Sequence, residues 1–386
     1  MKMKLLQLFI TASIPVLKTL LITALGSYLA TERVNILGED TRKHLNSVVF
    51  FVFNPALVGS SLADHNIQTI TYDSMIKLWF MPLNILLTFV VGSIFGWILN
   101  LLTRTPPHLR GLIIGFCAAG NLGNLLLIII PAVCKEKGSP FGAPDVCYNS
   151  GLAYASLSMA ISAVYLWSYV YNIMRISSKK CTLDQDTIQS LEGISISNQQ
   201  IMAPPGKLKK RIMKVVKKLN LETVFSPSIV AAIIGFVIGV VPPVRNVFIE
   251  DGAPLRVIDD TVSLLGGGAI PTVTLIIGGN LLKGLRGSGI RTSLVIGVIV
   301  VRYVALPLTG ILIVKGATKF GLVHSDPLYM FVLLLQFSLP PAVNIATITQ
   351  LFGAGEKECS VIMLWTYVLA SLALTFWSAF FMWLVA

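Results

Sequence analysis

The sequence predicts an all-α polytopic membrane protein, and three observations lead to this prediction. Of the 386 residues, 54% are hydrophobic and only 12% are charged. About a quarter of the residues in a typical soluble domain are charged, so a soluble fold would lack polar side chains to cover its surface. The apolar residues gather in long stretches, and the basic residues gather between them. This composition excludes the secreted, collagen-like and disordered classes.

Ten stretches are long enough to cross a bilayer, which requires about 20 mostly apolar residues per helix. They cover residues 7–30, 44–63, 76–102, 109–134, 151–174, 226–247, 258–282, 291–315, 327–352 and 359–385. The first stretch is long and contains Pro15 and Lys18, which favours a retained helix over a cleaved signal peptide. All connections are short except the polar segment 175–225.

This polar segment divides the chain into two groups of five spans, residues 1–174 and 226–386. Residues 175–224 contain ten Lys or Arg against four Asp or Glu. Because basic loops remain in the cytoplasm, the segment is expected there and both termini on the opposite side. The same loops account for the net charge of +12, which in a soluble protein would indicate nucleic-acid binding.

Within the polar segment, residues 207–219 have apolar side chains at helical spacing opposite a cationic face. This pattern predicts an amphipathic helix that lies on anionic lipid headgroups. A target helix of the calmodulin type is the alternative.

Because the two halves have opposite orientations, a five-helix repeat would be inverted. Short segments rich in Pro, Gly or Asn recur in matching order, about 220 residues apart. The pairs are Asn54-Pro55 with Ile270-Pro271, Pro82 with Pro307, and Gly120–Asn124 with Pro340–Asn344. We therefore expect two inverted five-helix repeats.

The fourth and ninth spans contain the candidate substrate site. Gly120-Asn121-Leu122-Gly123-Asn124 and Pro340-Pro341-Ala342-Val343-Asn344 are poor helix interiors, so both helices are expected to break near the middle of the membrane. The N-terminal ends of half-helices attract anions, and Asn side chains add neutral amide donors. This combination predicts a carboxylate site without a buried cation. Helix kinks with packing glycines are the alternative.

Several features argue against other chemistry. No Asp or Glu lies deep inside a predicted span, and the sequence has no phosphate-binding Gly-Lys-Ser/Thr motif and no His/Cys/carboxylate cluster. Strong ion coupling, an ATP-driven pump, a metal centre, a cofactor and an enzyme are therefore not expected.

A few polar side chains leave two interpretations open. Asp73 and Lys77 are four residues apart, which suits either a surface ion pair or a gating pair. Lys18 and Arg302 lie deeper in spans, where snorkelling or an internal polar contact is more usual than a substrate role. Cys134 and Cys147 flank the loop after the fourth span, and the sequence leaves open whether they form a disulfide.

These motifs resemble the plant PIN-LIKES family, which is related to the PIN auxin efflux carriers. The resemblance covers nearly the whole chain, and its most specific parts are Asn54-Pro55, Gly120–Asn124 through Pro131, Val301-Arg302-Tyr303 and Leu339–Asn344. It implies ten spans in two inverted repeats, with the fourth and ninth crossing at the substrate site. It also implies indole-3-acetic acid (auxin) as the substrate, the endoplasmic reticulum membrane as the location, and control of intracellular auxin accumulation.

The resemblance extends to single residues. Asn124 matches the crossover Asn of the PIN carriers and Pro340 their proline in the ninth span, while Asn54 falls where the second span lines the pocket. Asp73 and Lys77 match an acid–lysine pair that supports transport in those carriers. The candidate substrate-binding residues are Asn54, Asn121, Gly123, Asn124, Pro271, Pro340, Pro341 and Asn344.

Two positions depart from the PIN pattern. Gly123 replaces a Pro, so the first break is expected to be looser, and Pro341 replaces a Gln, so the pocket polarity is expected to differ. The hydrophilic loop is also short, which argues against plasma-membrane sorting.

The predicted function is an alternating-access carrier for auxin-like carboxylates. A sodium- or proton-coupled organic-anion transporter and a non-transporting auxin-binding sensor are the alternatives. The expected partners are a small carboxylate and the lipid bilayer, with no nucleic acid and no cofactor. The sequence leaves open the transport direction, the coupling ion and the oligomeric state, including a homodimer.

Overall fold

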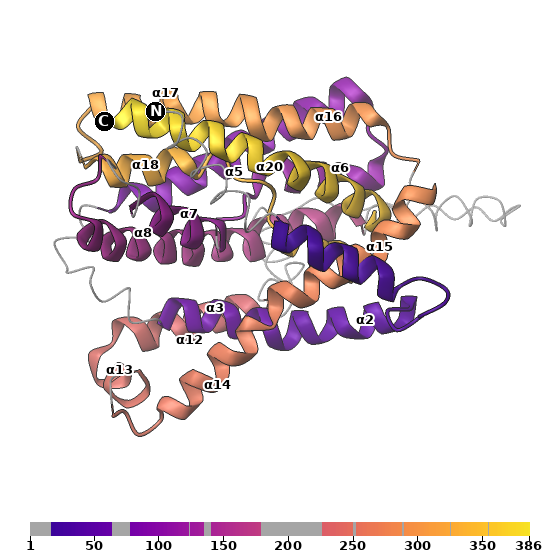
Figure 1. Ribbon diagram of the computed structural model, residues 1–386, viewed down its shortest axis with the longest axis horizontal. Helices are drawn as coiled ribbons and strands as arrows, with labels where there is room; N and C mark the ends of the chain where they lie inside the picture. The colour runs from indigo at the N-terminus through magenta and orange to yellow at the C-terminus, as the bar shows by residue number, and fades with distance from the viewer. Residues whose placement is uncertain are drawn as a thin grey trace, which may run out of the picture.

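The computed structural model describes residues 17–63, 78–122, 124–134, 140–178, 226–249, 252–287, 289–324, 326–353 and 355–386. The regular secondary structure in these ranges is helical (Figure 1). After a first helix at Leu17–Leu29, the chain forms α2 (Glu39–Val48), the π-helical turn η1 (Val49–Phe53), α3 (Asn54–Ala63), α5 (Phe80–Thr103), α6 (Pro107–Ala118), α7 (Asn124–Cys134), α8 (Pro144–Tyr165) and the π-helical turn η3 (Leu166–Val170). The second half forms α12 (Pro227–Val240), α13 (Pro242–Phe248), α14 (Arg256–Gly267), α15 (Ala269–Gly287), α16 (Thr292–Val300), the π-helical turn η4 (Val301–Ala305), α17 (Leu306–Lys319), α18 (Pro327–Leu335), α19 (Asn344–Phe352) and α20 (Glu356–Val385).

Proline residues determine where several of these helices begin. Pro107, Pro144, Pro227, Pro242 and Pro327 each occupy the first turn of a helix. A helix does not use the N–H groups of its first turn, so the missing N–H of proline has no cost there. The same property that starts these helices also prevents the preceding one from continuing.

Six helices in the described ranges are long and apolar enough to cross a membrane. They cover Glu39–Ala63, Phe80–Thr103, Pro144–Ser178, Arg256–Leu282, Thr292–Lys319 and Glu356–Val385, and each overlaps one predicted span.

The other four predicted spans are not single long helices in the described ranges. The first is described only from Leu17 onward. The fourth consists of α6 and α7, the ninth of α18 and α19, and the sixth of α12, followed by α13 after a bend of 100°. The count of ten spans therefore remains a prediction.

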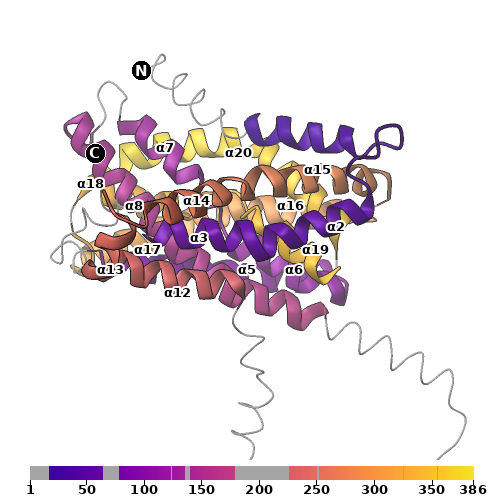
Figure 2. The same ribbon diagram turned by 90° about the horizontal axis from the view of Figure 1, so that it is seen from below.

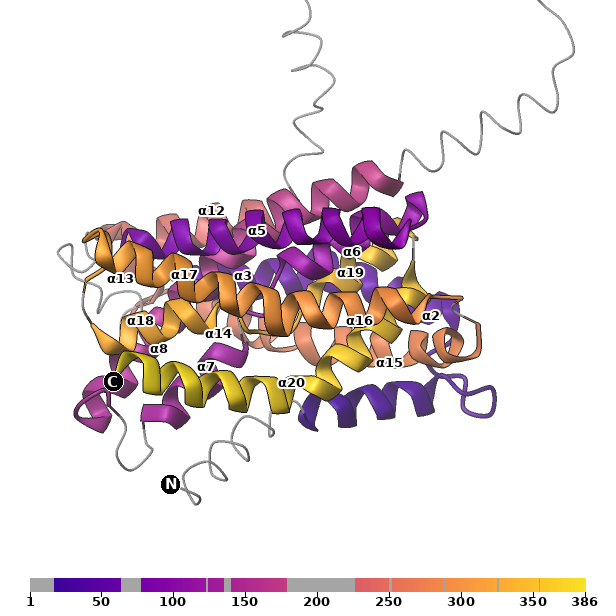
Figure 3. The ribbon, with the colours of Figure 1, turned by 90° about the horizontal axis from the view of Figure 1, so that it is seen from above.

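The helices form two groups that lie one above the other in Figure 1. The α3 group contains α2, η1, α3, α12, α13 and α14, and the α5 group contains α5, α6, α7, α8, α16, α17, α18 and α20. Helix α15 runs from the α3 group to α20, as the views of Figures 1 and 3 both show.

Close approach of backbones holds α12 against α3. A Cβ atom added to Gly235 would lie 2.3 Å from the carbonyl oxygen of Gly59. Only glycine at position 235 permits this separation, and small residues at such contacts are the usual basis of helix packing in membranes.

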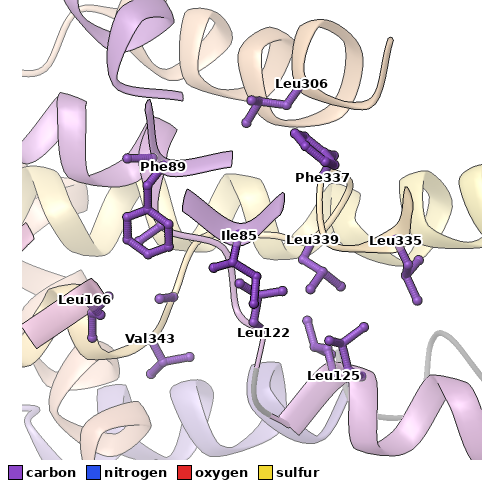
Figure 4. Close-up of a cluster of buried hydrophobic side chains, with 14 of the residues drawn as sticks. Ile85, Phe89, Leu122, Leu125, Leu166, Leu306, Leu335, Phe337, Leu339 and Val343 are labelled. Carbon is purple, nitrogen blue, oxygen red and sulfur yellow. The ribbon is translucent and has the colours of Figure 1, made fainter. Parts of the chain in front are cut away.

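Buried apolar side chains fill the α5 group and surround the two helix breaks (Figure 4). Leu122 from the first break and Phe337 and Leu339 from the second are almost fully buried there. In Figure 4 the ring of Phe337 lies beneath Leu306 of α17, while Leu122 lies below Ile85 of α5. Packing of these side chains keeps each break in one conformation.

The outer surface is apolar, as expected for a protein in a bilayer. Large apolar side chains such as Leu264, Leu312 and Trp383 have more than 70% of their surface exposed. Many exposed side chains of this kind are unfavourable in water and favourable in lipid.

Candidate functional site

Two broken helices meet at one point of the molecule. Helix α6 ends at Ala118 and α7 begins at Asn124, while α18 ends at Leu335 and α19 begins at Asn344. The two connecting segments run antiparallel and pair at Gly120 and Pro341. Each is the segment where the sequence predicts a break.

Backbone hydrogen bonds join these segments. The Asn121 N–H donates to the Pro340 carbonyl at 2.8 Å, and the Ala342 N–H donates to the Ala119 carbonyl at 3.0 Å. Unpaired backbone groups are costly inside a membrane protein, so this pairing offsets part of what each broken helix loses. We call the paired segments, residues 119–122 and 336–343, the crossover.

A buried cation lies directly against the crossover. Arg302, in the π-helical turn η4, has no exposed surface. Its Nε donates to the Leu339 carbonyl at 3.0 Å and its Nη1 to the Cys117 carbonyl at 3.2 Å, while Nη2 donates to the carbonyls of Leu339 and Pro340. One guanidinium therefore binds the end of α6 and the second break together.

Two features explain why this cation is tolerated. The carbonyl groups at the C-terminal end of a helix are acceptors with partial negative charge, and Arg302 faces such an end at Cys117. Gly120 also leaves room, since a Cβ atom there would lie 2.6 Å from Arg302 Nη2. The sequence did not predict a buried cation beside the two breaks, and fixed backbone carbonyls accept its charge. That the carboxylate itself is held without a cation stays a prediction. Of the two interpretations of Arg302, the internal polar contact is the one present.

Helix α20 binds the crossover through Tyr367 and binds the turn η4 through its Thr366 carbonyl. The Asn121 Nδ2 donates to the Tyr367 hydroxyl at 2.9 Å, and that hydroxyl donates to the Pro341 carbonyl at 3.0 Å. The Tyr303 hydroxyl, next to Arg302, donates to the Thr366 carbonyl of the same helix at 2.6 Å.

A buried polar network fixes the start of the second break. Asn84 Nδ2 donates to Gln336 Oε1 at 2.7 Å, and Gln336 Nε2 donates to Ser158 Oγ at 2.9 Å. All three side chains lack exposed surface. The sequence motifs did not predict this network, although polar residues inside otherwise apolar spans were the available signal.

A cavity of about 70 Å³ adjoins the crossover. It lies between the α3 group and the α5 group, and its polar lining includes Asn121 and Asn344 from the two breaks. Leu122, Leu166 and Val343, which are labelled in Figure 4, also line it. Its other lining residues are Leu57, Val58, Ser61, Gly120, Met159, Ala160, Ser162, Ala163, Ile270 and Ala342.

Two N–H groups in the first turn of α19 are not free to bind an anion. The Ile345 and Ala346 N–H groups donate to the Ala342 and Val343 carbonyls. These two N–H groups are therefore occupied, while Asn344 lines the cavity together with Ala342 and Val343. That this helix end binds an anion stays a prediction.

Asn54 lies near this cavity without a partner. It is fully buried, and neither its Oδ1 nor its Nδ2 makes a hydrogen bond among the described residues. Leu57, Val58 and Ser61 line the cavity three, four and seven residues later, so Asn54 shares their face of α3. An unpaired buried amide costs about 1–3 kcal/mol, which is unusual for a residue with only a packing role.

The structure places the remaining predicted residues as follows. Pro340 and Pro341 are buried within the crossover. Pro271 is exposed in α15, while its neighbour Ile270 lines the cavity. Gly123, Asp73, Lys77 and the side chain of Asn124, which begins α7, lie outside the described residues.

Cys134 and Cys147, whose pairing the sequence left open, form a disulfide with Cα atoms 5.5 Å apart. The bond joins the end of α7 to the beginning of α8 and so fixes the helix that follows the first break.

Comparison with known proteins identifies the family. A family model described as membrane transport protein matches residues 11–378. The chain is 57% identical over 390 residues to protein PIN-LIKES 1 of Arabidopsis thaliana, which covers all of this chain and 82% of that relative. It is 56% identical over 392 residues to PIN-LIKES 3 of the same plant, covering 99% of this chain and all of that relative. The chain belongs to the PIN-LIKES family. The resemblance found in the sequence motifs is thus confirmed.

Membership of this family establishes the general class of the chain. PIN-LIKES proteins are membrane transporters and not enzymes, so a small-molecule substrate and a location in a membrane follow. An uncharacterized transporter of Schizosaccharomyces pombe is a more distant relative, with 21% identity over 411 residues, 90% of this chain and 89% of its own.

Proposed function

We propose that this protein carries indole-3-acetic acid (auxin) across the endoplasmic reticulum membrane and so controls intracellular auxin accumulation. The proposal includes ten spans in two inverted five-helix repeats and transport by alternating access. The observation that supports it best is the cavity beside the crossover, which is lined by an asparagine from each break, Asn121 and Asn344.

The chemistry of this cavity suits a carboxylate. Each side-chain amide has two N–H donors, so Asn121 keeps one for a carboxylate oxygen beside its bond to Tyr367, and Asn344 also lines the cavity. Hydrogen bonds to charged groups contribute about 1.5–3 kcal/mol each. The Arg302 guanidinium lies behind Gly120, with its donors directed at backbone carbonyls. Its charge favours an anion in the cavity through space, since charges interact strongly at low dielectric. Arg302 is thus a positioning residue that does not touch the substrate.

The position of the cavity suits alternating access. The α3 group forms one wall and the crossover, within the α5 group, forms the other. A site at the boundary of two helix groups opens to one side of the membrane and then the other when one group moves past its partner. The crossover would move as a unit, because Arg302 and Tyr367 bind both breaks together.

A metal-coupled mechanism is less well supported than uniport. The carbonyls of Cys117, Leu339 and Pro340 are natural ligands for a coupling cation, but the Arg302 guanidinium already binds them. We therefore propose transport without a bound sodium ion. The sensor alternative assigns signalling to residues 175–225, most of which lie outside the described residues.

Uptake of radiolabelled indole-3-acetic acid into proteoliposomes tests this function. Asn344→Ala and Asn121→Ala are each expected to reduce uptake about tenfold, which corresponds to the loss of about 1.4 kcal/mol from one hydrogen bond to a charged group. Asn172→Ala is the matched control, because its amide donates to the Ser168 carbonyl and does not line the cavity. Wild-type uptake by both cavity variants at equal protein abundance would refute the assigned site.

A further inference from the structure

A second hollow lies on the outer side of the helix bundle. It has a volume of about 390 Å³ and is formed by side chains of α3, α5, α8 and α12. Its lining consists of Leu62, Pro82, Leu157, Ala160, Ile161, Val164, Tyr165, Ile229, Ala232, Ile233, Phe236 and Val240. None of these side chains is charged. We call this hollow the lateral groove.

The lateral groove opens toward the lipid. Ile233 and Phe236 line it and are 52% and 53% exposed. Helix α12, which contains both, lies at the edge of the bundle in Figure 2. The one hydroxyl in the lining, that of Tyr165, donates to the Pro82 carbonyl at 3.3 Å. The groove therefore presents an apolar surface to the bilayer.

The lateral groove and the crossover cavity share one lining residue. Ala160 of α8 lines both. On α8, Met159 and Ser162 face the cavity, while Leu157 and Ile161 face the groove. Helix α3 divides in the same way, with Ser61 on the cavity side and Leu62 on the groove side. The cavity that contains the two asparagines and the apolar groove thus have Ala160 in common.

The crossover cavity and the lateral groove differ in volume, so they suit different parts of a ligand. Pockets for whole ligands usually have volumes of about 300–1,000 Å³. The cavity of about 70 Å³ is large enough for a carboxylate but not for an aromatic ring system as well. The groove of about 390 Å³ is large enough for such a ring.

We propose that the lateral groove is a portal from the bilayer that binds the aromatic ring of an amphiphilic weak acid while its carboxylate reaches the crossover cavity past Ala160. This proposal rests on the proposed function and adds a route and a substrate class to it. Indole-3-acetic acid has the required form, because an apolar ring and a carboxylate are separated by one carbon atom. A phospholipid acyl chain is the competing occupant, but the groove lining has no cation to hold a phosphate.

Photolabelling tests the portal independently of transport. The probe is a phenylacetic acid with a diazirine on its ring, and its methyl ester is the comparison, both added to phosphatidylcholine proteoliposomes. The acid is expected to label peptides that contain Ile229–Phe236 and Leu157–Tyr165, and excess indole-3-acetate is expected to remove that label. The ester, which lacks the charge that the cavity binds, is expected to give label that indole-3-acetate does not remove.

Two matched variants sharpen the test. Ile233→Trp fills the groove and is expected to reduce the acid-dependent label about tenfold and to raise the KM for uptake by a similar factor. Ile234→Trp is the control, because Ile234 has the same side chain and similar exposure of 55% but does not line the groove.

The outcomes separate the portal from the carrier function. Uptake by the wild type without competable label in the groove would overturn the portal and leave the carrier function standing. Competable label without uptake would support the portal and reject the carrier function. Equal, non-competable labelling by acid and ester would mean that the groove holds lipid, and would also overturn the portal, as would an unchanged KM in Ile233→Trp.

Discussion

At the residue scale, the sequence identifies the candidate amides but not their hydrogen bonds. Asn121, Asn344 and Asn54 stand out because asparagine is rare inside apolar helices. Their separate environments depend on residues far away in the chain, such as Tyr367, which accepts from Asn121. Arg302 shows the same limit, since a lone Arg in an apolar span fits several roles until the carbonyls that face it are known.

Asn54 provides a prediction that separates function from packing. Asn54→Leu replaces an amide that has no partner with an apolar side chain of similar size. Removal of an unpaired buried polar group is expected to stabilise the fold by about 1 kcal/mol, which raises the melting temperature by a few degrees. If the amide binds substrate, uptake of indole-3-acetic acid falls about tenfold in the same variant.

The control for this prediction is Asn46→Leu in α2. Asn46 is also buried, but its Nδ2 donates to the Thr347 carbonyl at 3.1 Å, so the substitution is expected to lower the melting temperature. Scanning fluorimetry and uptake are measured on both. An Asn54→Leu protein that is less stable than wild type, with normal uptake, would show that Asn54 has a structural role.

At the element scale, the helix breaks are predictable because their cause is local. Pro340 and Pro341 lack the N–H groups that a continuous helix needs, and the Gly and Asn residues around position 120 favour other conformations. The partners that hold the breaks are not local. Gln336 bonds to Asn84 and Ser158, 252 and 178 residues away, so no short sequence pattern contains them.

The hydrogen bonds by which Arg302 joins the end of α6 to the second break can be tested through Arg302→Lys. A lysine ammonium is compact and lacks the planar fork that reaches Cys117 and Leu339 together. We expect the maximal uptake rate to fall about tenfold, because the crossover no longer moves as a unit, with the KM within about twofold because Arg302 does not touch substrate.

Arg291→Lys is the matched control for Arg302→Lys. Arg291 also donates to a backbone carbonyl, that of Thr103 at 3.0 Å, but it is exposed and far along the chain from both breaks. It is expected to keep wild-type rates. A large rise in KM for Arg302→Lys with an unchanged maximal rate would mean that Arg302 contacts the substrate directly.

At the scale of the whole molecule, periodic apolar stretches indicate a membrane protein, but not which helices pack together. The division into the α3 and α5 groups depends on contacts such as Gly235 against Gly59, which join residues 176 positions apart. Among the described residues, six helices are long and apolar enough to cross a membrane unbroken, while α6 with α7 and α18 with α19 are broken helices that each cover one predicted span. The orientation in the membrane is predicted from loop charge alone, and a separate experiment tests it.

The five cysteines provide that test without any engineering. The proposed topology places Cys181 in the cytoplasm and the Cys134–Cys147 disulfide in the lumen, an oxidising compartment in which such a bond persists. Cys117 and Cys359 are buried, so they are expected to react slowly in the folded protein. In sealed endoplasmic reticulum vesicles, a membrane-impermeant maleimide is therefore expected to modify Cys181 at once. Cys134 and Cys147 are expected to react only after the vesicles are permeabilised and the disulfide is reduced, and the opposite order of labelling would reverse the orientation.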